Sequence, residues 1–177
     1  MMNDKKGYFP VFINLENKKI IVVGGGMVAC RKITTLLSFT RHISIYSRQL
    51  CEPLQEYVSE YPCVVWEGEN PTEEQIRQAD LVIAATSDRQ ENARISSICH
   101  REGIMVNVAD AKEECSFFFP SVVTRGNLTV GISTGGISPA FCKRVRQEIE
   151  EWLPRDYEEY EMDGIYGQEG TDSWKKK

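Results

Sequence analysis

Two kinds of hydrophobic pattern alternate over the first 110 residues of the chain. Short runs rich in β-branched residues predict buried strands, and the apolar residues between these runs recur at helical spacing. We expect strands at 18–23, 43–46, 63–66, 81–85 and 104–108. We expect helices at 27–39, at about 50–61, from Thr72 with Gln75 completing a capping box, and at 89–102 with Gly103 as the stop. Strands that alternate with helices through short connections predict an α/β fold with a parallel, doubly wound sheet.

The pattern changes after residue 110. Two β-rich runs, 117–124 and 128–133, flank a turn signal at 125–127 and predict an antiparallel hairpin. A helix follows, with Ser138 as its N-cap and Pro139 at its first position. This segment therefore lies outside the alternating part of the fold and forms a small α+β unit.

Three glycines follow the first strand directly, in the sequence Gly24-Gly25-Gly26-Met27-Val28-Ala29, which fits G-x-G-x-x-A. Gly24 permits a tight turn, Gly26 lets the backbone approach a pyrophosphate, and the small Ala29 allows the helix to pack closely on the sheet. The helix that opens at Met27 and Val28 offers amide donors and a positive dipole end to phosphates. A purely structural turn is the alternative, but the surrounding strand–helix units favour a Rossmann-like dinucleotide-binding domain.

The end of the second strand carries no acidic residue to grip the ribose hydroxyls of a dinucleotide. Ser47, Arg48 and Gln49 stand there instead, so polar side chains or backbone groups must take this role. Arg48 would admit NADP through its 2′-phosphate, although an isolated surface arginine is the simpler interpretation. We expect NAD as the cofactor.

Charge is distributed unevenly along the 177 residues, of which 41% are hydrophobic and 27% charged. Residues 148–177 hold ten of the 26 acidic and four of the 21 basic residues, a net of −6, whereas the formal net charge of the whole chain is −5. The remainder is close to neutral, so it can form a basic pocket for an acidic ligand. We expect no nucleic-acid partner.

Six cysteines lie at least 12 residues apart, and they form no C-x-x-C motif. No apolar run approaches the length of a membrane span, and the polar N-terminus resembles no signal peptide, so we expect free thiols, a cytoplasmic location and no membrane partner. His42 and His100 suit surface positions, and we expect no metal site.

Five motifs together resemble the precorrin-2 dehydrogenase and sirohydrochlorin ferrochelatase family, in the form of the N-terminal domain of sirohaem synthase. The first is the glycine motif extended by Cys30-Arg31-Lys32, whose Arg-Lys pair is far more specific than the glycines. The others are Ala84-Ala85-Thr86-Ser87-Asp88 with Asn92, Val106-Asn107-Val108-Ala109-Asp110, Cys115-Ser116-Phe117-Phe118-Phe119-Pro120 and Ile132-Ser133-Thr134-Gly135-Gly136-Ile137-Ser138-Pro139. The resemblance covers residues 8 to about 150.

The resemblance implies oxidation of precorrin-2 to sirohydrochlorin, with a hydride passing to NAD. The aspartate of the family that is most closely tied to chemistry falls on Asp110, which would accept a proton or hold the substrate. An aspartate that caps the turn before Ala111 is the alternative. We assign Thr86, Ser87 and Asn107 to the cofactor site as well.

The substrate that the resemblance implies carries eight carboxylates, so its pocket needs cations and polar donors. Our candidates are Ser133, Thr134, Arg125, Lys143 and Arg144. A solvated helix face is the alternative for each of the cations. The resemblance also implies a homodimer, and we expect the aromatic run 117–119 at the subunit interface.

We therefore expect a NAD-binding domain at 1–112, a hairpin-plus-helix dimerisation and substrate segment at 113–153, and an acidic tail at 154–177 that is mobile or a shortened helical extension. Sirohydrochlorin ferrochelatase activity is a possible second function, which the short tail makes less expected. A non-catalytic NAD-sensing module is the competing interpretation, but it would leave Asp110 and the hairpin without a use.

Overall fold

The computed structural model describes residues 8–153, which form two compact units divided between Phe119 and Pro120. We expected this boundary after residue 112, and it lies seven residues later because 113–119 stays with the first unit. The acidic tail expected at 154–177 lies outside the described residues.

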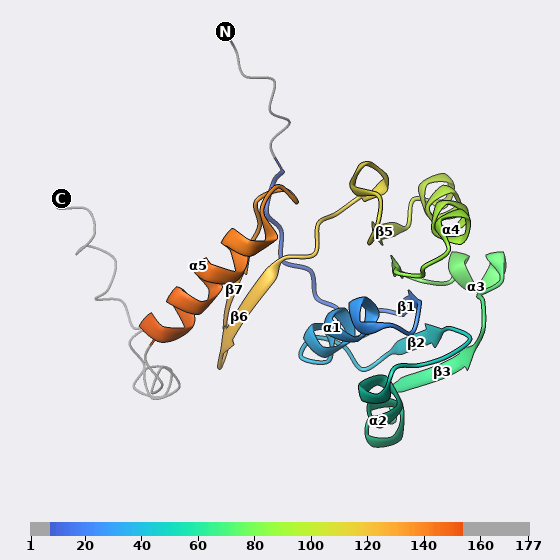
Figure 1. The fold of residues 1–177 in the computed structure, drawn as a ribbon, viewed down its shortest axis with the longest axis horizontal. Coiled ribbons are helices and arrows are strands. Elements are labelled where there is room, and N and C mark those ends of the chain that lie inside the picture. Colours follow the sequence, from blue (N-terminus) through green and yellow to red (C-terminus); the bar gives the residue numbers. More distant parts are fainter. Residues whose placement is uncertain (1–7, 154–177) are drawn as a thin grey trace, which may run out of the picture. The chain divides into compact units, whose positions relative to one another are not determined.

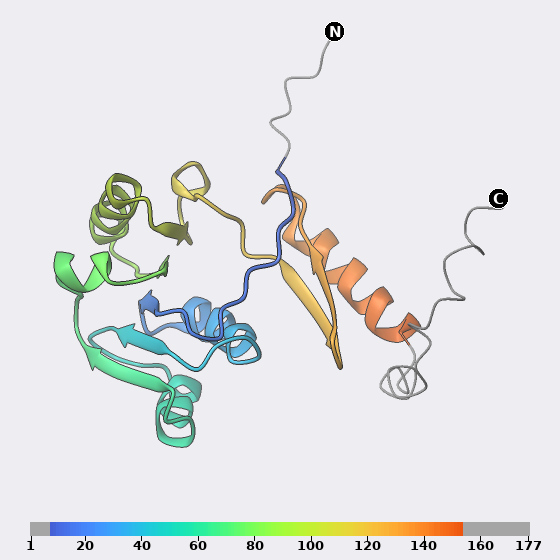
Figure 2. The same cartoon turned by 180° about the vertical axis from the view of Figure 1, so that it is seen from behind.

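The first unit contains five strands, four α-helices and one short 3-10 helix (Figures 1 and 2). Its strands are β1 (Ile20–Val23), β2 (Ile43–Tyr46), β3 (Val64–Gly68), β4 (Leu81–Ala84) and β5 (Met105–Val108). Its helices are α1 (Met27–Leu36), α2 (Glu52–Glu60), α3 (Glu73–Arg77), α4 (Arg89–Glu102) and the 3-10 helix η1 (Lys112–Glu114). All strand pairs are parallel, in the order β3-β2-β1-β4-β5, which confirms the predicted α/β class.

Successive side chains of a strand point to opposite faces of the sheet, and in β1 and β4 the side chains on both faces are buried. Ile20 and Val22 face a cluster that includes Ile33 of α1 and Leu54 of α2. Their neighbours along β1 face a second cluster, which includes side chains of α3 and α4. The continuous apolar runs of the sequence therefore correspond to central strands covered by helices on both sides.

Local signals fix several helix ends as predicted. Thr72 and Gln75 form the capping box of α3, and Gly103 ends α4 in the left-handed conformation with a φ of 71°. The helix α1 ends at Leu36, three residues earlier than expected, although the partly buried Leu37 still packs on the core. The predicted helix was too long because hydrophobic periodicity shows which residues are buried and not which backbone conformation they adopt.

The aromatic run, which we expect at a subunit interface, also makes contacts within the first unit. Phe117 and Phe119 pack against the core cluster of the first unit, and the ring of Phe118 meets Tyr8 edge-on at 4.5 Å. The chain after β5 therefore uses these rings to fold back onto the dinucleotide domain.

The second unit is a hairpin of β6 (Ser121–Arg125) and β7 (Leu128–Ile132) followed by α5 (Pro139–Trp152). Ser138 caps α5 by accepting a hydrogen bond from the Phe141 amide at 3.3 Å, as predicted. Both strands are shorter than the runs 117–124 and 128–133, because 117–119 belongs to the first unit.

Candidate functional site

The carboxyl ends of β1, β4 and β5 lie side by side at one edge of the sheet (Figure 1). Hydrogen bonds extend the ladders past the strands: the amide of Ala85 donates to the Val23 carbonyl at 2.7 Å, and that of Ala109 to the Ala84 carbonyl at 2.9 Å. The glycine turn after β1, Thr86 after β4 and Asp110 after β5 are therefore brought together at this edge. In open α/β sheets ligands bind at such an edge.

The first two glycines of the turn are required by close backbone approach. Gly24 has a φ of +123°, and a Cβ atom there would lie 2.3 Å from the Ala85 carbonyl oxygen. A Cβ atom on Gly25 would lie 1.9 Å from the carbonyl oxygen of Gln49. We predicted no role for Gly25 from the sequence. The only sequence signal for its close packing is its place in a run of three glycines.

Gly26 differs from its two neighbours because a Cβ atom there would meet nothing within 4 Å. Gly26 is the N-cap of α1, and as a glycine it has no side chain to accept hydrogen bonds from the first helix amides. The first turn of α1 contains no acidic residue. Met27 and Val28 are exposed at this helix end, whereas Ala29 is buried against the core. An open approach to uncapped helix amides fits the pyrophosphate of a dinucleotide.

The loop after β2 closes on itself beside the glycine turn. Ser47 Oγ donates to the Gln49 carbonyl at 2.7 Å, and the amide of Cys51 donates to the Gly25 carbonyl at 2.8 Å. The Arg48 guanidinium pairs with Glu69 and is 82% exposed. Ser47 and Gln49 therefore shape the loop, and Arg48 is the group of the three that is most open to a ligand.

The loop after β4 is organised by Asn92, a buried residue in the first turn of α4. Thr86 donates to Asn92 Oδ1 from its amide at 3.2 Å and from its hydroxyl at 2.9 Å. Ser87, the other predicted residue of this loop, is exposed. The loop thus presents Thr86 and Ser87 at the same edge as the glycine turn.

Asp110 is exposed just beyond β5, and its Oδ1 accepts a hydrogen bond from Asn92 Nδ2 at 3.1 Å. The 3-10 helix η1 that follows has Ala111 at its N-cap, without a side-chain hydrogen bond. The hydrogen bond from Asn92 holds this exposed carboxylate at the edge of the sheet. It also brings Asn92 into the site, a residue that our sequence analysis noted in a motif but did not select.

Asn107 is held by contacts within the first unit. Its side chain is buried, and it accepts from Lys32 Nζ at 2.8 Å and donates to the Phe117 carbonyl at 3.0 Å. Both ends of the amide are thus used inside the protein. Asn107 therefore fixes the chain after β5, and its cofactor role stays a prediction.

Lys32 of α1 is a second residue that the site reasoning passed over. Its ammonium lies 4.4 Å from the centre of the Phe119 ring, a cation–π contact, and burial lowers its pKa from 10.5 to about 8. The Arg31-Lys32 pair of the sequence motif was the signal for this position. Lys32 secures the segment 117–119 against the first unit.

The predicted substrate residues all belong to the second unit. Ser133 Oγ accepts from the Gly135 amide at 3.1 Å, and Thr134 Oγ1 accepts from the Ser138 amide at 2.9 Å, so both hydroxyls are fixed at the turn before α5. Arg125 lies at the opposite end of the hairpin, because it pairs with Leu128 while Ser121 pairs with Ile132. A four-residue separation along a strand corresponds to roughly 13 Å.

Two exposed cations lie on the first turns of α5. Lys143 is exposed, and Arg144 lies over the Phe141 ring at 5.2 Å and 3.5 Å from a carboxylate oxygen of Glu148. The structure therefore brings Ser133 and Thr134 together near the start of α5 and separates them from Arg125.

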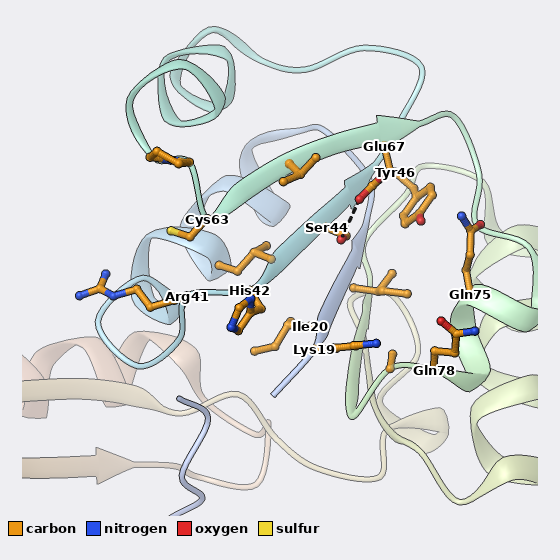
Figure 3. Close-up of a pocket in the computed structure, with 15 residues that line it drawn as sticks. Lys19, Ile20, Arg41, His42, Ser44, Tyr46, Cys63, Glu67, Gln75 and Gln78 are labelled. Atoms are coloured by element: carbon orange, nitrogen blue, oxygen red, sulfur yellow. Dashed lines mark hydrogen bonds between the residues drawn. The ribbon is translucent and has the colours of Figure 1, made fainter. Parts of the chain in front are cut away.

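A cavity of about 380 Å³ lies over another part of the sheet, on the faces of β1, β2 and β3 (Figure 3). The five-residue helix α3 contributes Gln75 to its lining, and Gln78 and Ala79 follow this helix. Ser44 and Glu67 meet across it at 3.4 Å. Of the described residues that we predicted for the site, none lines this cavity, so we do not identify it with the dinucleotide site.

The six cysteines are all free, as predicted. Burial raises the pKa of the Cys99 thiol to about 12 and also raises the pKa of Cys30 and Cys115, so these thiols are protonated at neutral pH. Within residues 8–153, no group of three or more His, Cys, Asp or Glu side chains is placed to hold a metal ion. No helix in the described part of the chain is long and apolar enough to cross a membrane.

The fold and the edge of the sheet define a dinucleotide-binding α/β unit joined to a hairpin–helix unit. Comparison with known proteins agrees with this class. Residues 11–121 match the family described as putative NAD(P)-binding, and residues 125–151 match the family described as sirohaem biosynthesis protein central. The chain belongs to the putative NAD(P)-binding family, with the sirohaem central segment following it, which confirms the resemblance found in the sequence.

Several curated relatives are siroheme synthases. The enzyme of Mannheimia succiniciproducens is 37% identical over 148 residues, and that of Actinobacillus succinogenes 38% over 148 residues. Each match covers 84% of this chain and 31% of the relative, so the chain spans about a third of the length of these proteins. A solved structure entitled "SirC, precorrin-2 dehydrogenase" has the same fold, with a TM-score of 0.73, 22% identity, and coverage of 88% of this chain and 76% of that one.

Proposed function

We propose that the chain catalyses the NAD-dependent oxidation of precorrin-2 to sirohydrochlorin. The observation that carries this proposal is the Asp110 carboxylate, which is exposed at the sheet edge shared with the glycine turn and held there by Asn92. The relatives named siroheme synthase and the neighbour titled precorrin-2 dehydrogenase support the proposal. In this reaction a hydride passes from the macrocycle to NAD, and a proton leaves as well.

The residues of the sheet edge fit a dinucleotide. Gly24 and Gly25 allow the turn, the open Gly26 admits the pyrophosphate, and the first amides of α1 donate to it. Thr86 and Ser87 border the other side of the same edge. When bound, NAD supplies the hydride acceptor.

Asp110 acts as the base in this proposal. Its Oδ1 is occupied by the Asn92 hydrogen bond, so Oδ2 takes the proton from the macrocycle. The side chain is exposed, which allows a bulky substrate to reach it.

The hairpin–helix unit supplies recognition of the substrate carboxylates. Lys143, Arg144 and Arg125 are the cations that we assign to this role, with Ser133 and Thr134 as donors. The fixed orientation of the two hydroxyls supports their assignment, because a preset donor loses little entropy on binding.

We also infer that NAD is preferred to NADP, that the protein acts in the cytoplasm, and that two copies form a homodimer. Glu69 supports the first inference, because it occupies the guanidinium of Arg48 that a 2′-phosphate would need. The free thiols fit a reducing compartment. Exposed apolar side chains of the second unit support the third: Ile137, Phe141 and Trp152.

The experiment compares the wild type with Asp110→Asn under anaerobic conditions, with precorrin-2 and NAD. We expect Asp110→Asn to lose at least 100-fold in turnover, within the range typical of a lost general base, while its affinity for NADH changes less than threefold. Unchanged turnover would remove Asp110 from the chemistry.

The same assay separates the alternatives. A non-catalytic NAD-sensing module would bind NADH but form no sirohydrochlorin. A ferrochelatase would insert iron into purified sirohydrochlorin without NAD. We expect the dehydrogenase reaction in the absence of any metal.

A further inference from the structure

Asn92 is a fully buried polar residue whose side chain uses all of its hydrogen-bonding capacity. Its Oδ1 accepts twice from Thr86, from the amide at 3.2 Å and from the hydroxyl at 2.9 Å. Its Nδ2 donates to the Thr86 carbonyl at 3.1 Å and to Asp110 Oδ1 at 3.1 Å. A carboxamide has two donor hydrogens and two acceptor lone pairs, so this orientation leaves none unused.

These contacts hold the amide rigidly. The Asn92 backbone is fixed in the first turn of α4, where its amide donates to the carbonyl of Asp88, the N-cap of that helix, at 3.1 Å. A buried and fully satisfied polar group is costly to rotate, because any other orientation leaves a donor or an acceptor without a partner. The direction of the Nδ2 donor toward Asp110 is therefore set by the Thr86 loop.

We propose that Asn92 is a positioning residue that fixes the Asp110 carboxylate relative to the Thr86 loop of the dinucleotide site. This inference rests on the proposed function, and it adds a residue that acts through Asp110. The hydrogen bond restrains an exposed carboxylate that would otherwise sample several rotamers, and it engages Oδ1 while Oδ2 takes the proton. Residues 18 apart in the sequence are thus linked into one unit at the carboxyl edge of β4 and β5.

The main variant is Asn92→Asp, which keeps the size of the side chain and an oxygen for Thr86 but replaces the donor by a carboxyl oxygen. Two carboxyls would then face each other, and one of them retains a proton to higher pH. We expect the acidic limb of the kcat/KM profile to move up by at least one pH unit. If the side chain at position 92 did not contact Asp110, this limb would stay where it is in the wild type.

A second readout needs no bound cofactor. The side-chain carboxyl carbon of Asp110, assigned by its absence from the spectrum of Asp110→Asn, is titrated by ¹³C NMR in the protein without dinucleotide. We expect its midpoint to rise by at least one pH unit in Asn92→Asp. The matched control is Ser96→Ala, which removes another buried polar side chain of α4 that does not contact Asp110. In this control both the midpoint and the pH profile should stay where they are in the wild type.

The outcomes separate the two proposals. Turnover by the wild type, with the acidic limb and the Asp110 midpoint both unchanged in Asn92→Asp, would overturn the positioning role and leave the proposed function standing. A wild type that binds NADH but does not oxidise precorrin-2 would overturn the proposed function, and the catalytic importance of Asn92 with it.

If Asn92→Asp does not fold, Asn92→Ser replaces it. The shorter side chain cannot span from Thr86 to Asp110, so kcat should fall at least tenfold while KM for precorrin-2 changes less than threefold. A kcat equal to that of the wild type would contradict the inference.

Discussion

Gly25 and Gly26 are neighbours in the sequence, but the structure gives them separate tasks. A Cβ atom on Gly25 would press against the backbone of Gln49, whereas one on Gly26 would enter open space. Gly25 is therefore needed for the turn, whereas Gly26 leaves open space at the start of α1.

We predict that Gly25→Ala lowers the free energy of unfolding by about 1–3 kcal/mol or more, the range of overpacking in a rigid site. Gly26→Ala, its matched control, should change this free energy by less than about 0.5 kcal/mol but weaken NADH binding at least tenfold. Chemical denaturation and fluorescence titration measure the two effects. Equal stability losses in both variants would contradict the assignment.

Lys32 makes the stability of the first unit depend on pH in an unusual direction. Its pKa is about 8 in the folded protein and 10.5 when unperturbed, so between these values the unfolded chain binds the proton and the folded protein does not. The stability contribution of Lys32 therefore rises with pH over this window, by up to about 1.4 kcal/mol per pH unit. Below pH 8 the ammonium is charged in both states and the contribution is constant.

The effect is measured by comparing the wild type with Lys32→Met, which lacks the titrating group. The wild type should gain stability relative to Lys32→Met between pH 8 and pH 9.5, as measured by urea denaturation at each pH. A difference that stays constant over this range would show that Lys32 titrates normally.

The sequence predicted most strand and helix positions because each element has its own local signal. It predicted a parallel sheet but not the strand order β3-β2-β1-β4-β5. The β-branched runs marked β1 and β4, and the Thr72 capping box marked α3. Strand limits were less accurate. Lys18 looks like part of β1 in the sequence, but its Nζ pairs with Asp80 at 2.8 Å, a contact between residues 62 positions apart.

The site could be predicted only in part for the same reason. The glycine turn was found because it follows a recognisable strand, whereas Asp110 was selected because the family resemblance implied its role. The close approach of Gln49 to Gly25, the bond from Asn92 to Asp110, and the use of Asn107 by Lys32 all depend on distant segments meeting. A local pattern contains no information on such contacts.

The loops after β2 and β3 are joined by an ion pair between Arg48 and Glu69. Glu69 pairs with Arg48, so the guanidinium is already partly neutralised. We predict that Glu69→Gln increases the affinity for NADPH three- to tenfold and leaves that for NADH within twofold. Arg48→Ala should weaken NADPH binding alone. Titration of both variants with both dinucleotides checks this, and parallel changes for NADH and NADPH would argue against a role for the pair in selectivity.

In the whole molecule, charge is distributed unevenly between the two units and the C-terminal residues. Residues 148–177 carry a net charge of −6 and residues 1–119 a net charge of −3, whereas residues 120–147 hold four basic residues and no acidic one. The cations of the second unit can therefore bind an acidic substrate although the chain as a whole is acidic.

The exposed apolar residues of the second unit predict the oligomeric state. Ile137 is 77% exposed and Phe141 47%, which is unusual for large apolar side chains gathered around one helix end. We predict that Ile137→Asp converts a dimer into a monomer in sedimentation experiments, because it would bury a charge in the interface. Thr124→Asp, at an exposed position of β6, is the control and should remain dimeric. A monomeric wild type would exclude the dimer.

Transfer of a hydride from precorrin-2 to NAD is the activity that we propose for this chain. Its most direct test is anaerobic incubation of the purified protein with precorrin-2 and NAD, following NADH and sirohydrochlorin together by absorbance. We predict that the two products form in equal amounts and that formation stops when NAD is omitted. Binding of NADH without formation of sirohydrochlorin would contradict the claim.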